Sequence, residues 1–367
     1  MNLYDEGSRP VILLGAGISR ETNIAPVLEA KVPILSSWAA MDLIDNYHPY
    51  YFGRPGVYGQ RCANTILHNA DVVLALGNRL SIWNTGYSGI RAGRLFIVDI
   101  DKEVLTRHPR AIRISMDTRM YIPSIPAQPY LFTSEWIDTC NNWRLQYPWV
   151  EEAHKDIDGY LNSYRFFQRI ESQLPDDVIL SVDAGCACSS AFQVLRLRAG
   201  QRIMTSGGLG EMGCALPAAV GASFAAPERQ VLAIVGDGAM MLNLQELQTI
   251  KHHNLPIKIL VFANDGYLMI KHTQEALGYK HMGVDSRSGV SCPDFVEVAN
   301  AIGISAAHID TWEDFDHLIP TFLSAQEPCL LQVKMHPHQP TIPKLQPIVV
   351  DGKIQSPSFE DMSPRLP

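Results

Sequence analysis

Short apolar runs alternate with amphipathic segments along the chain, which is the pattern of an α/β protein. The clearest unit is Val231–Tyr267 (VLAIVGDGAMMLNLQELQTIKHHNLPIKILVFANDGY). Two β-branched runs, 231–235 and 257–263, enclose a segment whose apolar residues repeat at helical spacing. Asn243 is a favourable N-cap, and Glu246 three residues later completes the spacing of a capping box. The pattern predicts a right-handed β-α-β unit whose two strands end at the same edge of a sheet.

Similar runs on both sides of this unit predict an α/β protein with two doubly wound parallel-sheet domains. We expect the proline-rich end of the chain to wrap a surface or to reach over the active site rather than to pack as an element. The expected strands are 10–17, 32–35, 72–77, 95–100, 178–182, 231–235, 257–263 and 329–335. The expected domains are a Rossmann-like domain at 1–125, a linker with a short helix at 126–157, a second α/β domain at 158–337 and a C-terminal tail at 338–367.

Two loops leave the predicted carboxyl edge of the sheet, where open α/β proteins bind their ligands. The first is GDG, with Asp237 at its centre, and the second is NDG, from Asn264 to Gly266. A carboxylate, an amide oxygen and a backbone carbonyl can bind Mg²⁺ if phosphate oxygens and water complete the octahedron. The glycines beside Asp237 let backbone N–H groups approach a diphosphate. The pattern indicates a Mg²⁺-diphosphate site, and the alternative is a glycine turn followed by an ordinary β-turn.

The composition limits the class of protein. The chain has 367 residues, 46% of them hydrophobic and 19% charged, with a net charge of −8. This charge argues against a nucleic-acid partner and against a basic anchor for acidic membranes. No apolar run reaches the roughly 18–20 residues of a membrane span, and the first residues lack the order of a signal peptide. Seven scattered cysteines favour a reducing compartment, so we expect a cytoplasmic protein.

Three smaller motifs carry little weight. The Gly15-Ala16-Gly17 turn after the first predicted strand is typical of a nucleotide-binding start, but the third glycine of the fingerprint is absent. Cys186 and Cys188 are too close in sequence for a usual zinc site, and no second pair follows them. The segment 336–338 (HPH) is isolated, so we expect no metal there.

The motifs together resemble those of thiamine diphosphate (ThDP) enzymes of the acetohydroxyacid synthase and pyruvate decarboxylase superfamily. GDG followed, roughly two dozen residues later, by Asn before a Gly-Tyr turn resembles the ThDP motif of that superfamily. The segment 205–222 (TSGGLGEMGCALPAAVGA) is similar to its other cofactor segment, and the order of 1–125 matches its middle domain. LSIWNTGYS, GVSCPDF and FEDMSPRLP look most like the acetolactate-synthase-like proteins of polysaccharide and nucleotide-sugar pathways.

The resemblance implies ThDP and Mg²⁺ as cofactors, with the thiazolium C2 of ThDP as the nucleophile. It implies Asp237, Asn264 and the Gly266 carbonyl as metal ligands, and Met212 as an apolar wedge between the two cofactor rings. Acetolactate synthases carry FAD in the middle domain, but we expect that domain to be a spacer without FAD here. The implied cofactor-binding residues are Gly185, Cys186, Gly208, Leu209, Gly210, Met212, Gly236, Asp237, Gly238, Ala239, Asn264, Gly266 and Tyr267.

The sequence departs from the acetolactate synthase pattern at several of the implied positions. Ala263 replaces the first of two paired asparagines, and 185–187 reads GCA in place of Gly-Gln-His, which removes polar contacts near the diphosphate. Trp83 aligns with the arginine that binds the carboxylate of the second keto acid in acetolactate synthases. Thr273 aligns with the tryptophan that selects this acceptor. These changes argue against authentic acetolactate synthesis and favour a larger, sugar-like acceptor.

The resemblance starts at the middle domain, whereas full-length relatives begin with a pyrimidine-binding domain that carries the catalytic glutamate. Glu6 and Glu21 lie in the wrong context to replace it. We therefore expect no catalytic residue on this chain and a glutamate from a pyrimidine-binding-domain polypeptide, in a homo-oligomeric carboligase or decarboxylase of small 2-keto acids. The alternatives are a truncated ThDP-binding protein with little activity and a non-catalytic scaffold. The Asp237 and Asn264 pair weighs against the scaffold.

Overall fold

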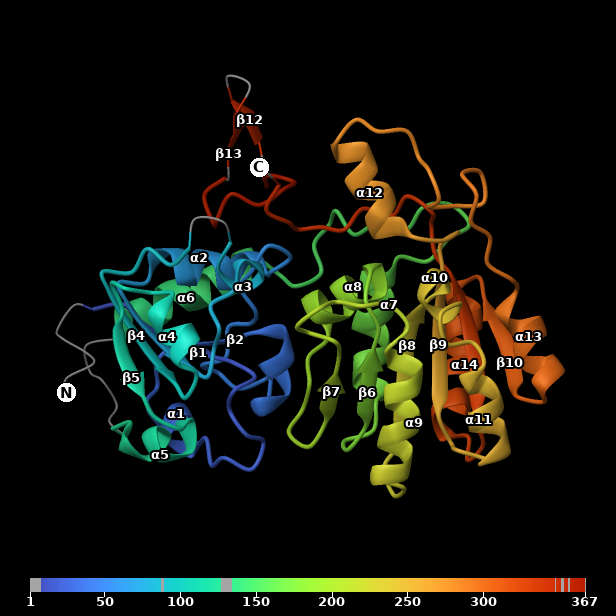
Figure 1. Ribbon diagram of the computed structural model, residues 1–367, viewed down its shortest axis with the longest axis horizontal. Helices are drawn as coiled ribbons and strands as arrows, with labels where there is room; N and C mark the ends of the chain where they lie inside the picture. Colours follow the sequence, from blue (N-terminus) through green and yellow to red (C-terminus); the bar gives the residue numbers. More distant parts are fainter. Residues whose placement is uncertain are drawn as a thin grey trace. The chain divides into compact units, whose positions relative to one another are not determined.

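The computed structural model describes residues 8–86, 89–126, 134–346, 348–350, 353–355 and 357–366. The chain forms two compact units, each described by itself below (Figure 1). Among the described residues, no helix is both long and apolar enough to cross a membrane. The first unit comprises residues 1–151, 197–199 and 342–367, and the second unit comprises residues 152–196 and 200–341.

The first unit is built on a five-stranded parallel sheet with the order β2-β1-β3-β4-β5, which is a doubly wound topology. Side chains of β1 alternate between two buried clusters, because successive residues of a strand point to opposite faces. Helices α2, α4 and α6 cover one face, and α1, η1 and η2 cover the other. The elements are β1 (Pro10–Leu14), α1 (Ala25–Glu29), β2 (Ile34–Ser36), η1 (Trp38–Leu43), α2 (Arg61–Asn69), β3 (Val72–Leu76), α3 (Ile82–Thr85), β4 (Arg94–Asp99), α4 (Lys102–Thr106), β5 (Ile112–Ser115), α5 (Thr118–Tyr121), η2 (Ile122–Ser124) and α6 (Ser134–Gln146).

The Gly-x-Gly turn after β1 has a packing reason of its own. The amide N–H groups of Gly15 and Gly17 donate to the carbonyls of Leu76 and Gly77, both at 2.9 Å. A Cβ on Gly15 would lie 2.1 Å from the Gly77 carbonyl oxygen. The close approach of the turns after β1 and β3 therefore requires glycine, whatever the first unit binds.

The end of the chain completes the core of the first unit, so the prediction that it does not pack as an element was wrong. Leu345, Phe359 and Met362 are buried against α2 and the sheet. The guanidinium of Arg61 in α2 donates to the carbonyl oxygens of Met362 at 3.0 Å and Pro364 at 2.6 Å. Between these contacts, β12 (Ile348–Val350) pairs antiparallel with β13 (Lys353–Gln355).

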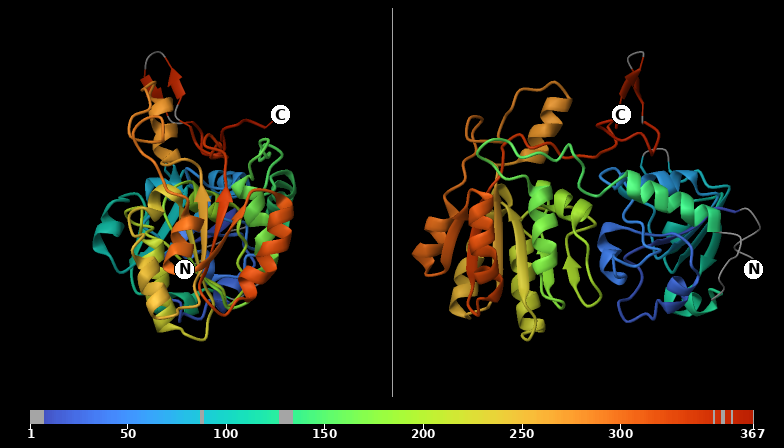
Figure 2. Two further views of the ribbon diagram at one scale, coloured as in Figure 1. Left: turned by 90° about the vertical axis from the view of Figure 1, so that its right-hand side faces the viewer. Right: turned by 180° about the vertical axis from the view of Figure 1, so that it is seen from behind.

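The second unit contains a six-stranded parallel sheet with the order β10-β11-β9-β8-β6-β7 and helices on both faces (Figure 1; Figure 2). Helices α9, α10, α11 and α13 bury an aliphatic cluster on one face. On the other face, Phe166 of α7 packs edge-on against Phe262 of β9 and Phe315 of α14. The elements are α7 (Ser163–Ile170), η4 (Glu171–Gln173), β6 (Ile179–Val182), α8 (Cys186–Val194), β7 (Arg202–Met204), α9 (Ala215–Ala225), β8 (Val231–Gly236), α10 (Asp237–Met240), α11 (Glu246–His252), β9 (Lys258–Ala263), α12 (Leu268–Ala276), α13 (Phe295–Ile302), β10 (Ser305–Ile309), α14 (Trp312–Ser324) and β11 (Cys329–Lys334).

The predicted β-α-β unit is present as β8, α10, α11 and β9, but its helix does not begin as predicted. Residue Gln245 takes the N-cap position of α11, and no side chain caps this helix. The Asn243 side chain instead donates from Nδ2 to the carbonyl oxygen of Gly213 at 2.6 Å. The predicted capping box was wrong because a tertiary hydrogen bond takes the capping side chain away from the helix.

Candidate functional site

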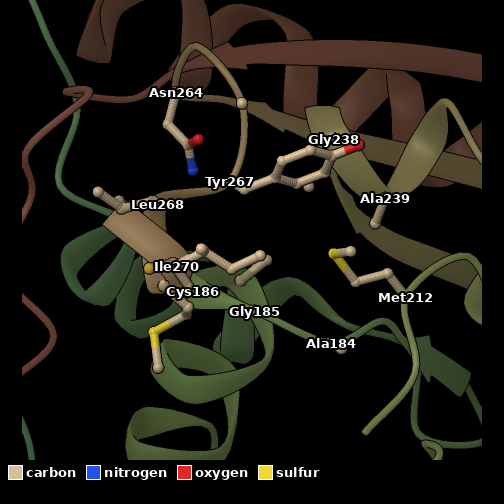
Figure 3. A pocket seen from close by; sticks show the side chains of 14 residues that line it. Ala184, Gly185, Cys186, Met212, Gly238, Ala239, Asn264, Tyr267, Leu268 and Ile270 are labelled. Carbon is tan, nitrogen blue, oxygen red and sulfur yellow. The ribbon is translucent and has the colours of Figure 1, made fainter. Parts of the chain in front are cut away.

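A pocket opens at the carboxyl edge of the second sheet, at the switch point where β7 and β8 lie on opposite sides of β6 (Figure 3). Ligands of doubly wound sheets bind at such points because the two loops diverge there. Its walls are formed by the loops after β6 and β9, the first turns of α8, α10 and α12, and the segment before α9 that carries Met212. The lining residues are Ala184, Gly185, Cys186, Ala187, Met212, Gly236, Gly238, Ala239, Asn264, Gly266, Tyr267, Leu268, Met269 and Ile270.

Most of the residues named from the sequence meet in this pocket, and their roles there stay predictions. Asp237 is buried behind the lining, next to Asn264 and Gly266. The predicted Gly208, Leu209 and Gly210 are not among the lining residues, and the Leu209 side chain is 89% exposed. The predicted residues that line the pocket are Gly185, Cys186, Met212, Gly236, Gly238, Ala239, Asn264, Gly266 and Tyr267.

Three oxygen atoms converge on one side of the pocket. Oδ1 of Asn264 lies 3.3 Å from Oδ1 of Asp237 and 2.9 Å from the carbonyl oxygen of Gly266. Neighbouring ligands of an octahedral Mg²⁺ ion, bound at 2.0–2.1 Å, lie about 3.0 Å apart. Hydrogen bonding favours the other orientation of the Asn264 amide when no cation is present, because its nitrogen then donates to both of these oxygens. With the oxygen turned inward, three acceptors face one another and only a cation can bridge them. The oxygen set therefore fits a small, hard cation.

Backbone amides hold the Asp237 carboxylate in place. Its Oδ2 accepts hydrogen bonds from the N–H groups of Asn264 at 2.8 Å and Gly266 at 3.0 Å, and Oδ1 accepts from Gly238 at 2.8 Å. Only 2% of Asp237 is exposed. Burial raises the pKa of Asp237 to about 6, although the backbone hydrogen bonds oppose the shift. A cation at this position would stabilise the carboxylate form of Asp237 and so offset the unfavourable free energy of burying its charge.

Two glycines are required by the geometry of the site. Gly266 has φ +110°, and a Cβ there would lie 2.4 Å from the carbonyl oxygen of Val284. Gly185 has φ +98° and precedes α8, while the space beside it is open. The N-terminal turn of α8 contributes Cys186 and Ala187 to the pocket wall. Free backbone N–H groups at a helix start attract anions, so this side of the pocket fits a diphosphate.

The loop that carries Met212 is anchored by an aspartate that the sequence analysis missed. Asp183 is fully buried at the end of β6, and burial raises its pKa. Its Oδ1 accepts from the N–H of Gly213 at 2.8 Å and its Oδ2 accepts from Ala215 at 2.8 Å. Met212 thus stands on one side of the pocket, with Ile270 on the other (Figure 3). The position of Asp183, directly after a buried apolar strand, was the sequence signal that could have identified it.

The remaining candidates are not among the residues that line the pocket. Trp83, in the first unit, is 64% exposed and stacks on Tyr58 with ring centroids 6.0 Å apart. Thr273, in α12, is exposed and donates from Oγ1 to the Met269 carbonyl at 2.9 Å. The rings of His336 and His338 lie 6.0 Å apart. The described residues hold no group of three or more His, Cys, Asp or Glu that could bind a metal.

Comparison with known proteins shows the family to which the chain belongs. The family described as "Thiamine pyrophosphate enzyme, central domain" matches residues 2–125, and "Thiamine pyrophosphate enzyme, C-terminal TPP binding domain" matches residues 183–333. The chain belongs to the ThDP-dependent, acetolactate synthase-like family. It is 26% identical over 365 residues to the acetolactate synthase isozyme 2 large subunit of Escherichia coli (strain K12), covering 98% of this chain and 65% of that protein. It is 28% identical over 354 residues to the isozyme 1 large subunit of the same organism, covering 94% and 62%.

A solved structure of a related fold confirms the predicted fold of two parallel-sheet α/β domains. The Rhodococcus jostii RHA1 thiamine diphosphate-dependent 4-hydroxybenzoylformate decarboxylase aligns with a TM-score of 0.71 at 22% sequence identity. The alignment covers 89% of this chain and 61% of that chain. This chain thus spans less than two thirds of the length of the relatives it matches.

Proposed function

We propose that this chain supplies the Mg²⁺–ThDP-binding half of an acetolactate synthase-like enzyme. The enzyme would decarboxylate a small 2-keto acid and join the product to an aldehyde, a keto acid or a sugar-like acceptor. The observation that carries the proposal is that the Asn264 amide lies between the Asp237 carboxylate and the Gly266 carbonyl, beside the start of α8. With its oxygen turned inward, the amide completes a set of three oxygens for a cation. Cation and diphosphate could be bound together there, which is how Mg²⁺ is usually held with a phosphorylated ligand.

Each part of the pocket has a task in this proposal. Asp237, Asn264 and the Gly266 carbonyl would hold the metal, and the backbone around Gly185 would face the diphosphate. Met212 would support the cofactor rings through a polarizable thioether. When bound, ThDP supplies a nucleophilic carbon and an electron sink for decarboxylation.

One chemical group is missing from the pocket. Among the described residues that line it, none carries a carboxylate side chain. We propose that a glutamate on a separate pyrimidine-binding-domain polypeptide protonates the aminopyrimidine, as the resemblance implies. We also propose that the chain forms a homo-oligomer in the cytoplasm. The exposed Trp83 and Thr273, in place of an arginine and a tryptophan, support a sugar-like acceptor.

Titration calorimetry with ThDP in the presence of Mg²⁺ tests the cofactor site. Asp237→Ala and Asn264→Ala should each weaken ThDP binding at least about ten-fold, because each removes an oxygen from the metal-bridged diphosphate contact. Asp316→Ala, which removes an exposed carboxylate on α14, is the matched control and should bind like the unmodified chain. Equal affinity of the Asp237→Ala variant and the unmodified chain would refute the proposal.

Complementation separates a half-site enzyme from a ThDP-binding protein without activity. The chain with ThDP, Mg²⁺ and pyruvate should release almost no CO₂, because general acid–base help of this kind contributes roughly 10²–10⁴-fold. A separately expressed pyrimidine-binding domain should restore turnover, and its Glu→Gln variant should restore far less. Ordinary rates without the added domain would show that these 367 residues contain the acid–base group.

A further inference from the structure

A buried ion pair links the helix that walls the pocket to a neighbouring loop. Lys271 lies in α12, and its Nζ is 3.2 Å from Oδ2 of Asp285 and donates to the carbonyl oxygen of Pro337 at 3.1 Å. Lys271 is 1% exposed and Asp285 is buried as well, with its Oδ1 accepting from the Ser288 hydroxyl at 2.6 Å. Helix α12 stands above the carboxyl ends of β8 and β9 (Figure 1; Figure 2). Neither charged residue lines the pocket.

The loop that carries Asp285 also forms hydrogen bonds with the turn after β9, which contains the proposed metal ligands Asn264 and Gly266. Ser286 donates from Oγ to Oδ2 of Asp265 at 2.8 Å. The Val284 carbonyl accepts from the N–H of Tyr267 at 2.8 Å, and it lies so close to Gly266 that only glycine fits there. A shift of this loop would therefore shift the Gly266 carbonyl.

Lys271 also lies next to the residues of α12 that form the pocket wall. Leu268, Met269 and Ile270 line the pocket from the start of α12, directly before Lys271. Lys271 is thus next to the α12 wall of the pocket, and Asp285 lies in the loop that contacts the turn after β9.

A contribution to the stability of the fold does not by itself explain why Lys271 and Asp285 form a buried ion pair. The cost of removing two charges from water offsets much of their attraction, and apolar residues of similar volume often stabilise a core as well or better. A charged pair with directional hydrogen bonds differs from an apolar pair in fixing the relative position of its elements. The contacts of Lys271 and Asp285 therefore suit a role in fixing α12 relative to the loop that carries Asp285.

We propose that Lys271 and Asp285 are positioning residues that set the Gly266 carbonyl and the α12 wall for Mg²⁺–ThDP binding. This inference rests on the proposed function. Outer residues that orient metal ligands typically change metal affinity by about 10- to 100-fold when removed. Neither side chain contacts the pocket, so the effect must pass through the backbone of the turn and the helix.

The chain offers a matched control for a lost buried lysine. Lys258 is fully buried at the start of β9, and its Nζ donates to the carbonyl oxygens of Pro256 at 3.2 Å and Glu327 at 2.9 Å. It lies at the opposite edge of the same sheet from the pocket. Lys258→Met and Lys271→Met therefore remove the same charge from the same unit, but only the second removes it near the site.

Titration calorimetry with ThDP and Mg²⁺ measures the effect without relying on activity. Lys271→Met should weaken ThDP binding at least about ten-fold, and Lys258→Met should stay within about two-fold of the unmodified chain. Amide exchange of a peptide containing Tyr267 should speed up in Lys271→Met only, because its N–H bonds to the braced loop.

Asp285→Asn keeps the side-chain volume, so it tests the positioning role if Lys271→Met does not fold. It should weaken ThDP binding in the same direction, by at least about three-fold. Affinities within two-fold of the unmodified chain for the folded Lys271 and Asp285 variants would overturn the positioning role, as would an equal loss in Lys258→Met. Absence of ThDP binding by the unmodified chain would refute the proposed function itself, and the positioning role with it.

Discussion

Replacing Asp237 by asparagine should stabilise the second unit when no cation is present. The asparagine oxygen can take the place of Oδ2 and keep the N–H groups of Asn264 and Gly266 as donors. Its amide nitrogen then stands 3.3 Å from the Asn264 side-chain amide, which can turn its oxygen inward to accept from it. The variant therefore keeps a hydrogen bond at this contact and no longer buries a negative charge. The hydrogen bond from the Gly238 N–H is lost, at a cost of about 1 kcal/mol that does not depend on pH.

The pH-dependent part follows from the pKa of Asp237, which burial raises from 3.8 to about 6. Because the folded-state pKa is above the unfolded value, the folded chain binds more protons between these values. The stability of the metal-free protein therefore falls as the pH rises from about 4 to about 6 and then levels off, with a total loss of about 3 kcal/mol. Asparagine does not titrate, so the stability difference between Asp237→Asn and the unmodified chain should grow by about 1.4 kcal/mol between pH 5 and pH 8.

Urea unfolding at several pH values, followed by amide exchange of peptides from β8 and β9, measures this difference in the second unit. A change of about 1.4 kcal/mol corresponds to roughly 3–6 °C in Tm for a domain of 150–250 residues. With Mg²⁺ and ThDP at about 100 times Kd, the order should reverse, because ligand binding adds about 2.7 kcal/mol to the unmodified chain only. A stability difference that is constant from pH 5 to pH 8 would refute the reasoning.

Three other outcomes are expected. Asp183→Ala leaves buried N–H groups without acceptors and should cost the second unit about 3 kcal/mol or more in urea unfolding, whereas an unchanged midpoint would argue that Asp183 anchors nothing. Met212→Ala should weaken ThDP binding about ten-fold in calorimetry and Met212→Leu less, because the contact depends on side-chain volume; equal affinities would remove the wedge role. Exposed apolar side chains of the second unit, such as Leu209 and Met282, should drive self-association visible by light scattering at micromolar concentration, and a clean monomer would contradict this.

The strands next to the site were predictable because they are fully buried and read as continuous apolar runs. β8 and β9 fall within one residue of their predicted limits, and the Asn264–Gly266 turn follows β9 as expected. The predicted GDG loop is instead the end of β8 at Gly236 and the first turn of α10. The short strands β5, β7 and β10 were missed, since their sequences are partly polar and carry no such run. Local pattern therefore located the residues proposed to bind the cation, which come directly after continuous apolar strands.

Contacts between distant segments were not predictable from local pattern. The capping role of Asn243 failed because Gly213, far away in sequence, accepts its side-chain hydrogen bond. The pocket wall from α12 and the contact of Lys271 with Asp285 depend on the position of the loop that carries Asp285. The hydrophobic pattern of the sequence does not predict that position. A tertiary partner can override a local preference worth about 1 kcal/mol, which explains these failures.

The burial of Phe359 and Met362 in the first unit has a consequence for protein synthesis. Residues 1–151 of that unit leave the ribosome before residues 342–367, so its core lacks these side chains while the residues between the two segments are being made. At 5–20 residues per second, the wait is roughly 10–40 s. During this interval the apolar surface that later covers Phe359 is open to chaperones, while residues 200–341 emerge and can fold. Nascent chains stalled before Leu345 should therefore expose their N-terminal portion to proteases.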